Sequence, residues 1–126
     1  MSVEACRAFM DDLESRELKR LERWFSDTTE LWVPPAAPVT GGRRILAMFR
    51  AIFRMYADLH WKVTEVHAIG ERRFFYLTDS WGTIGEATPY RNHVATVIVF
   101  DEEGRIASLS DYFKDTAIFR QGQKTS

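Results

Sequence analysis

Two aspartates and one histidine lie within segments whose other residues are mostly apolar or aromatic. Asp111 interrupts segment 105–114, Asp79 follows an aromatic run, and His93 opens segment 93–100. A carboxylate on an apolar face loses hydration, which raises its pKa. If both aspartates enter one cavity, one stays protonated as an acid while the other serves as the base. That division of roles suits enolisation, aldol cyclisation or attack of water on an epoxide.

The alternation of side chains along a strand assigns each of these three residues to a face. The residues that share their faces are Ala107, Leu109 and Phe113 for Asp111, Phe75, Leu77 and Trp81 for Asp79, and Ala95 and Val97 for His93. Alternation does not tell which face is inside. A purely structural interpretation therefore stays open for each: an exposed strand-end residue for Asp111 and His93, and a residue at a β-bulge for Asp79.

The composition is typical of one globular domain without a strong electrostatic field. The chain has 126 residues, a net charge of -1 and a pI of about 6.3, so little in it would attract nucleic acid or an anionic membrane. Cys6 is the single cysteine, which excludes an internal disulfide and suits a reducing, cytoplasmic compartment. The N-terminal residues lack the apolar segment of a signal peptide. No histidine, cysteine or carboxylate spacing matches a metal site, and we expect no cofactor.

Apolar periodicity predicts helices in the first part of the chain and strands in the rest. Spacings of three and four residues predict a helix that starts at Val3, bends at 14–16 and continues to Phe25. A further helix is predicted over 43–59, with Thr40 as its N-cap. The predicted strands are 31–33, 61–69, 73–83, 90–100 and 105–114. This order is typical of an α+β domain, with a core over about 3–119 and a polar tail at 120–126.

Segment 93–100 reads His-Val-Ala-Thr-Val-Ile-Val-Phe and is apolar on both faces. An antiparallel strand with one face in water normally alternates polar and apolar residues. One face of this strand can cover the helices, but the other needs a second cover. We therefore predict a homodimer through the outer face of the sheet.

Three motifs carry a resemblance to a known superfamily. They are Leu31-Trp32-Val33-Pro34-Pro35, Gly41-Gly42-Arg43, and Gly104-Arg105-Ile106 followed by Asp111-Tyr112-Phe113. Through them the chain resembles the nuclear transport factor 2-like (NTF2-like) superfamily, in particular SnoaL-like polyketide cyclases, limonene epoxide hydrolases and ketosteroid isomerase-like proteins. The resemblance covers about 3–119. It implies a cystatin-like cone in which N-terminal helices pack into a curved antiparallel sheet around a mostly apolar pocket.

The resemblance also implies positions for the three candidate residues. Asp111 matches a catalytic carboxylate of the superfamily that points into the cone, and Asp79 aligns with a pocket carboxylate of the epoxide hydrolases. SnoaL-type cyclases pair a histidine with the late-strand aspartate, a role that His93 would take. However, Leu77 stands where the hydrolases have an arginine, and Leu31 and Val33 stand where they have a tyrosine and an asparagine that hold water. Epoxide hydrolysis by that mechanism is therefore not expected.

The first hypothesis is a cofactor-free enzyme of the isomerase or cyclase type, acting on a hydrophobic cyclic or polyketide-like substrate. Asp111, Asp79 and His93 are its predicted catalytic residues. The residues predicted to contact the ligand are Trp32, Leu77, Trp81, Ala95, Leu109 and Phe113. Because this fold serves many functions, a noncatalytic module that binds a hydrophobic ligand and a dimerisation or partner-binding domain remain as alternatives.

Overall fold

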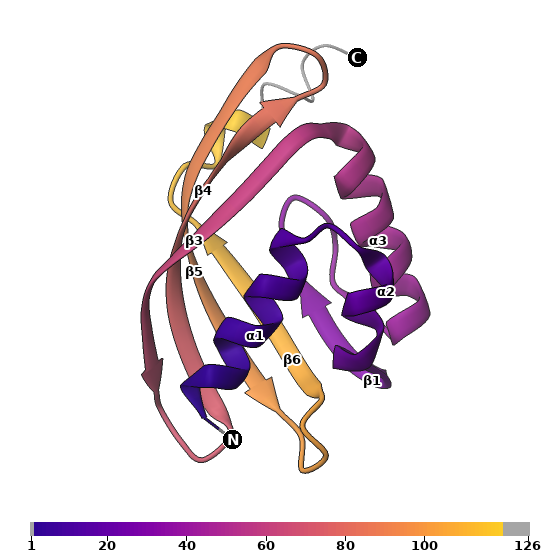
Figure 1. The fold of residues 1–126 in the computed structure, drawn as a ribbon, viewed down its shortest axis with the longest axis vertical. Coiled ribbons are helices and arrows are strands. Elements are labelled where there is room, and N and C mark those ends of the chain that lie inside the picture. Colours follow the sequence, from indigo (N-terminus) through magenta and orange to yellow (C-terminus); the bar gives the residue numbers. More distant parts are fainter. Residues whose placement is uncertain (1, 120–126) are drawn as a thin grey trace.

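The computed structural model describes residues 2–119 and shows helices packed against one face of a curved sheet (Figure 1). The elements are α1 (Val3–Glu14), α2 (Leu18–Leu21), the short 3-10 helix η1 (Glu22–Trp24), β1 (Phe25–Trp32), β2 (Val39–Thr40), α3 (Gly42–Met55), β3 (Tyr56–Ala68), β4 (Arg73–Ile84), β5 (Thr88–Phe100) and β6 (Ile106–Phe113). The polar tail predicted at 120–126 lies outside the described residues.

The bend predicted in the N-terminal helical segment is confirmed, and a buried carboxylate stabilises it. Asp12 of α1 is 3% exposed. It accepts hydrogen bonds from Trp24 Nε1 at 2.8 Å, Arg23 Nη2 at 2.8 Å and Arg20 Nε at 3.0 Å. Burial would raise the pKa of Asp12, but these hydrogen bonds outweigh it and hold the pKa below its ordinary value. The carboxylate therefore joins α1 to α2 and η1.

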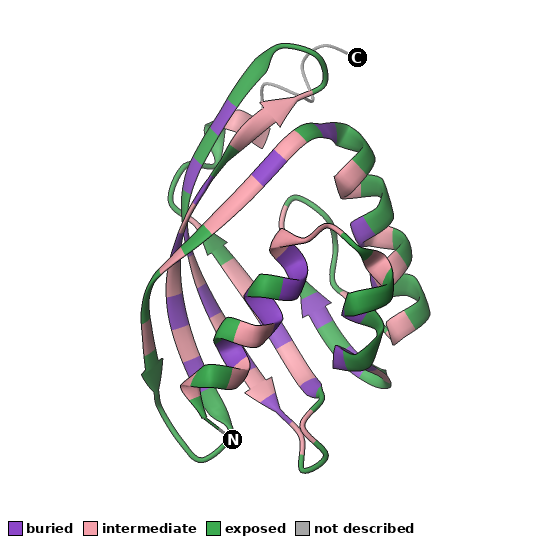
Figure 2. Ribbon diagram, in the orientation of Figure 1, coloured by how far each residue is buried: buried purple, intermediate pink, exposed green. Residues whose placement is uncertain are grey.

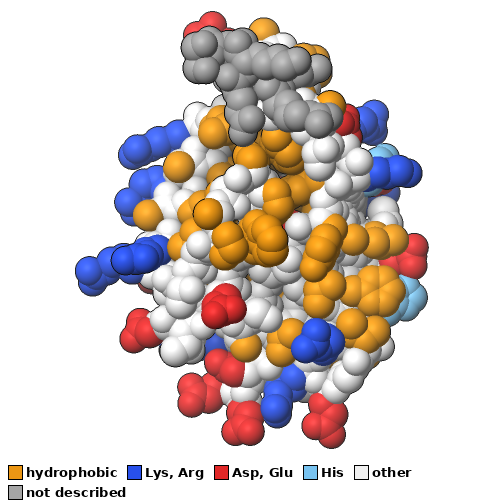
Figure 3. Space-filling model, turned by 180° about the vertical axis from the view of Figure 1, so that it is seen from behind, with side chains coloured by type: hydrophobic (Ala, Val, Ile, Leu, Met, Phe, Trp, Pro, Cys, Tyr) orange, Lys and Arg blue, Asp and Glu red, His pale blue; other side chains and the backbone are white. Residues whose placement is uncertain are grey.

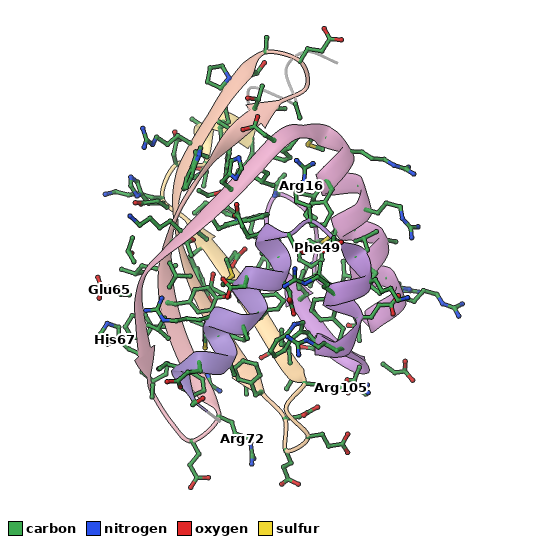
Figure 4. The ribbon with its side chains drawn as sticks, in the orientation of Figure 1. Arg16, Phe49, Glu65, His67, Arg72 and Arg105 are labelled. Atoms are coloured by element: carbon green, nitrogen blue, oxygen red, sulfur yellow. The ribbon has the colours of Figure 1, made fainter. Side chains whose placement is uncertain are left out.

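Arg16, in the bend, is bonded to the end of α3. Its guanidinium donates hydrogen bonds to the carbonyl oxygens of Phe53, Tyr56 (2.8 Å) and Ala57 (3.2 Å). The Phe53 carbonyl is one that the end of α3 leaves without an intrahelical partner, and the carbonyls of Tyr56 and Ala57 follow it at the start of β3. A cation also suits the negative end of the helix dipole. Figure 4 shows Arg16 between the bend and α3. This contact positions the end of α3.

The second long helix is shorter than predicted. It ends at Met55, and Tyr56 begins β3. Tyr56 and Leu59 continue the helical spacing of Ile52, but they are buried because they form strand positions on the inner face. The predicted N-cap is also wrong: Thr40 pairs with Glu30 in the sheet, and Gly41, with a φ of 97°, precedes the helix.

The sheet has the order β2-β1-β6-β5-β4-β3. Its neighbours are antiparallel except β1 and β6, which are parallel, so the predicted all-antiparallel sheet is wrong at this one pair. The chain reaches β6 after passing through α3 and the three long strands, which permits the parallel pairing. Strand β1 also begins at Phe25 rather than Leu31, because its first half is polar and gave no strand signal.

A close backbone contact lets β3 and β4 curve. The register of β3 shifts between Tyr56 and Asp58, opposite Ile84 and Thr83 of β4, and Gly82 follows opposite Leu59. A Cβ added at Gly82 would overlap the carbonyl oxygen of Asp58. Glycine is therefore required where the strands bend towards the helices. Burial then alternates along β4 and β5, with the buried positions on the face towards the helices (Figure 2).

Candidate functional site

A cavity of about 890 Å³ lies between the inner face of the sheet and the helices. It is lined by α1, α3, residues 33–36, strands β3 to β6, and residues 118–119. Phe49 points from α3 towards the sheet in Figure 4 and contributes to the apolar wall. The volume is in the range of sites that hold a small organic molecule, about 300–1,000 Å³.

Asp111 is the one charged side chain among the described residues that line this cavity. It lies on β6, directly opposite Thr96 of β5, whose hydroxyl donates a hydrogen bond of 2.6 Å to Oδ1 of Asp111. Burial raises the pKa of Asp111 to about 6, against a smaller lowering by the Thr96 hydrogen bond. A carboxylate with this pKa is ionised at neutral pH and is still basic enough to accept a proton.

Several neutral hydroxyl groups share the cavity with Asp111. Tyr76, Thr78 and Ser80 alternate along β4, and Tyr90 and Thr96 belong to β5. Burial raises the pKa of Tyr90 to about 12 and that of Tyr76 well above its ordinary value. Both phenols are therefore neutral at physiological pH and can donate hydrogen bonds.

Asp79 and His93 lie on the opposite face of the sheet, so the prediction that they enter the pocket is wrong. They are directly opposite each other on β4 and β5, and His93 Nδ1 is 2.6 Å from Asp79 Oδ1. Their side chains are 42% and 62% exposed, respectively. Because side chains alternate, a choice of the wrong face displaces every candidate on that strand. The two-carboxylate arrangement with Asp79 therefore does not form in the cavity.

The predicted ligand contacts divide in the same way. Leu109 and Phe113 share the face of Asp111 and line the cavity as predicted. Leu77, Trp81, Ala95 and Trp32 do not line it. Leu77 and Ala95 are partners across β4 and β5 on the outer face. The ring of Trp81 stacks on that of His60 with 5.4 Å between the ring centroids, and Trp32 is 50% exposed. These four residues belong to the outer surface of the domain.

Five hydroxyl residues of the cavity were not predicted from the sequence: Tyr76, Thr78, Ser80, Tyr90 and Thr96. Their signal was present: small polar residues alternate through the aromatic strand β4. These polar residues can be assigned to the cavity only when the register between strands is known. Thr96, for example, is recognised as a site residue because it lies opposite Asp111.

The described part of the chain holds neither a cluster of metal-binding side chains nor a membrane-spanning helix. No group of three or more histidine, cysteine, aspartate or glutamate side chains is placed to hold a metal ion within residues 2–119. Over the same residues, no helix has the length and apolar character needed to cross a membrane.

Solved structures share the fold over nearly the whole chain. An NTF2-like protein of unknown function from Burkholderia pseudomallei has a TM-score of 0.84 at 19% identity, covering 96% of this chain and 97% of that chain. A protein from Catenulispora acidiphila with a ketosteroid isomerase-like fold, in complex with trimethylamine, has a TM-score of 0.82 at 20% identity, with 96% and 93% covered. An LEH-like epoxide hydrolase from M. tuberculosis has a TM-score of 0.77 at 20% identity, with 93% and 85% covered.

At these identities the likeness shows the fold alone, and it confirms the predicted NTF2-like α+β fold. No curated protein matches the chain. Residues 6–109 match the SnoaL-like domain, a range that includes Ser80 and Thr96 and ends just before Asp111. Asp111 therefore lies outside the matched range, and its position in the cavity is the evidence for its role. The match spans most of the 126 residues, and the chain belongs to the SnoaL-like domain family.

Proposed function

We propose that this protein is a small-molecule enzyme of the isomerase or cyclase type, with Asp111 as its general base. The observation that supports this most directly is a carboxylate with a pKa of about 6 in a cavity whose other lining residues, within 2–119, are uncharged. General bases work best when their pKa lies near the working pH. The apolar walls suit a hydrophobic, cyclic or polyketide-like substrate.

The proposed step is removal of a proton from a carbon next to a carbonyl group. The carboxylate of Asp111 takes the proton, and the electron pair of the C–H bond moves to the carbonyl oxygen as an enolate. An isomerase returns the proton from Asp111 to a different carbon. In a cyclase, the enolate carbon attacks a second carbonyl, and the proton goes to the new alkoxide. Thr96 donates a hydrogen bond that holds the carboxylate in place. Tyr76 is directly opposite Thr96 on the neighbouring strand β4, where its neutral phenol can donate a hydrogen bond to an enolate oxygen.

The second candidate function is a noncatalytic module that binds a hydrophobic ligand. It is favoured by the position of Asp79 on the outer face, which leaves Asp111 without a second carboxylate among the described cavity residues. A lone carboxylate can act as a base, but it must also serve as the acid that returns the proton.

The rate of proton exchange on a cyclic ketone should distinguish the two. We expect the protein to speed deuterium incorporation beside the carbonyl of β-tetralone in D₂O, followed by proton NMR. After subtraction of the uncatalysed rate, the rate should rise about tenfold per pH unit below about pH 6 and become constant above it, because only ionised Asp111 accepts the proton. Binding of β-tetralone without faster exchange would instead support the binding module.

We also propose that the outer face of the sheet binds a second copy of the chain. Figure 3 shows hydrophobic side chains gathered across the middle of this face. The exposed aromatic residues Trp32, Trp81 and Tyr112 are 50%, 39% and 59% exposed. Strands β3, β4, β5 and β6 have 13, 12, 13 and 8 residues, so together they present a face on the order of 700 Å². A standard interface buries about 800 Å² per partner.

The face also carries charges of both signs, including Asp79 and Arg91, which a two-fold related copy can pair. We expect Val97→Lys, in the centre of this face, to convert a dimer to a monomer in sedimentation at micromolar concentration. Ala47→Lys, on the exposed side of α3, is the matched control and should leave the dimer intact. A wild-type monomer under these conditions would show that the face has another role.

A further inference from the structure

The hydroxyl group of Ser80 lies in the cavity without a hydrogen-bond partner. Ser80 is 1% exposed, and its Oγ is the one buried side-chain polar atom of the described residues for which no partner is found. A buried hydroxyl normally has a partner, because leaving it unsatisfied is costly. The neighbour opposite it, Asn92, makes its side-chain hydrogen bonds to the backbone of His93 and Asp115 and none to Ser80.

A second hydroxyl lies close to that of Ser80. Tyr90 precedes Asn92, the partner of Ser80, by two residues on β5, so its side chain lies on the same face and diagonal to Ser80, while the Ser80 hydroxyl makes no hydrogen bond. Tyr90 is 5% exposed, and its ring packs edge-on against Tyr56 at 5.3 Å, which limits its movement. Two neutral O–H donors are therefore held beside one another in a cavity wall.

The charge of the cavity limits what these donors can bind. No lysine, arginine or histidine is among its described lining residues, and its one charge is the negative Asp111. A carboxylate or phosphate group would enter without a counter-ion and would be repelled by Asp111. A carbonyl or hydroxyl oxygen needs no counter-ion and can accept from both donors.

The position of Ser80 along the sheet sets the length of the ligand. Asp111 is opposite Thr96, which is opposite Tyr76 on β4. Ser80 follows four residues after Tyr76, which is roughly 13 Å along the strand. A molecule that reaches both Asp111 and Ser80 must therefore extend along the cavity over a distance typical of several fused rings.

We propose that Ser80 and Tyr90 form a binding site for a neutral oxygen of the ligand, at the end of the cavity remote from Asp111. The ligand class is an elongated, uncharged, mostly hydrophobic ring system with a carbonyl or hydroxyl group at that end. This inference rests on the proposed function for the idea that the other end of the ligand reacts at Asp111. The binding of the oxygen itself does not depend on any reaction.

The test compares two probes that differ by one hydroxyl group, β-naphthol and naphthalene, by fluorescence titration. Their affinity ratio in each variant is compared with the ratio in the wild type, which cancels their different solubility in water. We expect Ser80→Ala and Tyr90→Phe each to reduce the preference for β-naphthol about 5- to 10-fold, the effect of one net hydrogen bond. Ser80→Thr, which keeps the hydroxyl, should retain the preference, as should Ser110→Ala on β6 outside the cavity lining.

A second readout guards against misfolding. Because Ser80 Oγ has no partner in the free protein, Ser80→Ala should leave the thermal midpoint of the free protein unchanged or raise it. A lowered midpoint would mean that the hydroxyl is already satisfied, and would overturn the inference. An unchanged probe preference in Ser80→Ala, or no binding of either probe, would overturn it as well.

The result can be separated from a failure of the proposed function. Asp111→Asn should abolish exchange on β-tetralone while it keeps the preference for β-naphthol. If that variant exchanges normally but Ser80→Ala loses the preference, the oxygen site stands and the catalytic proposal falls. If exchange depends on Asp111 but the preference for β-naphthol does not depend on Ser80, the catalytic proposal stands and the oxygen site falls.

Discussion

We expect Asp111→Asn to lower the rate of deuterium exchange on β-tetralone by about 100- to 10,000-fold, the usual contribution of a general base. Asparagine has nearly the same shape as aspartate and can still accept the hydrogen bond from Thr96, so the cavity should keep its form. What the variant loses is the ability to take a proton. The binding of naphthalene should therefore change little, which separates loss of chemistry from loss of the site.

The chain offers a matched control for this experiment. Asp79→Asn makes the same chemical change on the outer face, where Asp79 is bonded to His93 and does not line the cavity. Its exchange rate should equal that of the wild type. Equal rates for Asp111→Asn and the wild type would exclude Asp111 as the base, and a large loss in Asp79→Asn would show that the outer face takes part.

Much of the fold could be predicted from the sequence because its signals are local. The helical spacing, the bend before Leu18 and the turn at 101–104 depend on neighbours within a few residues. The errors arose where distant contacts decide the structure. Tyr56 and Leu59 continue a helical pattern, but pairing with β4 places them in a strand. The parallel pairing of β1 with β6 joins residues about 80 positions apart and leaves no local trace.

The candidate site was predicted in part for a related physical reason. When only one face of a strand is apolar, the residues of that face can be predicted to lie inside. Strands β4 and β5 carry apolar residues on both faces, so this rule does not decide between them. Leu77 and Ala95 on the outside are as hydrophobic as a cavity wall, so alternation gave Asp79 and His93 an apolar setting, and the resemblance assigned both to the pocket although they lie on the outer face. Asp111 was placed in the pocket through the resemblance, and the register with Thr96 then identifies the correct face of β5.

Asp111 and Asp12 should give the stability of the protein opposite dependences on pH. The pKa of Asp111 is raised by burial to about 6 from its ordinary value of 3.8. Between these values the folded protein binds more protons than the unfolded chain, so the free energy of unfolding falls as pH rises. The contribution of Asp111 is fully present below about pH 4 and is lost above about pH 6. The total corresponds to about 3 kcal/mol.

The pKa of Asp12 is lowered by its hydrogen bonds, which outweigh its burial, so its contribution has the opposite sign. It stabilises the folded state above the unfolded pKa of about 4 and is lost as pH falls below that value. Asp12→Asn should therefore destabilise the protein at neutral pH by about 1.5–3 kcal/mol, the range for hydrogen bonds to a charged group. This loss should shrink in acid.

Urea unfolding of the wild type and both variants at about pH 4 and pH 8 measures these differences. Asp111→Asn should match the wild type at the lower pH and be more stable by up to about 3 kcal/mol at the higher pH, since it no longer buries a charge. If Asp111→Asn is instead less stable than the wild type at the higher pH, then the Asp111 carboxylate is favourably solvated or paired, and its pKa is not raised. A residue whose charge weakens the fold, in a cavity that could easily hold a neutral side chain, indicates that the charge serves the ligand and not the structure.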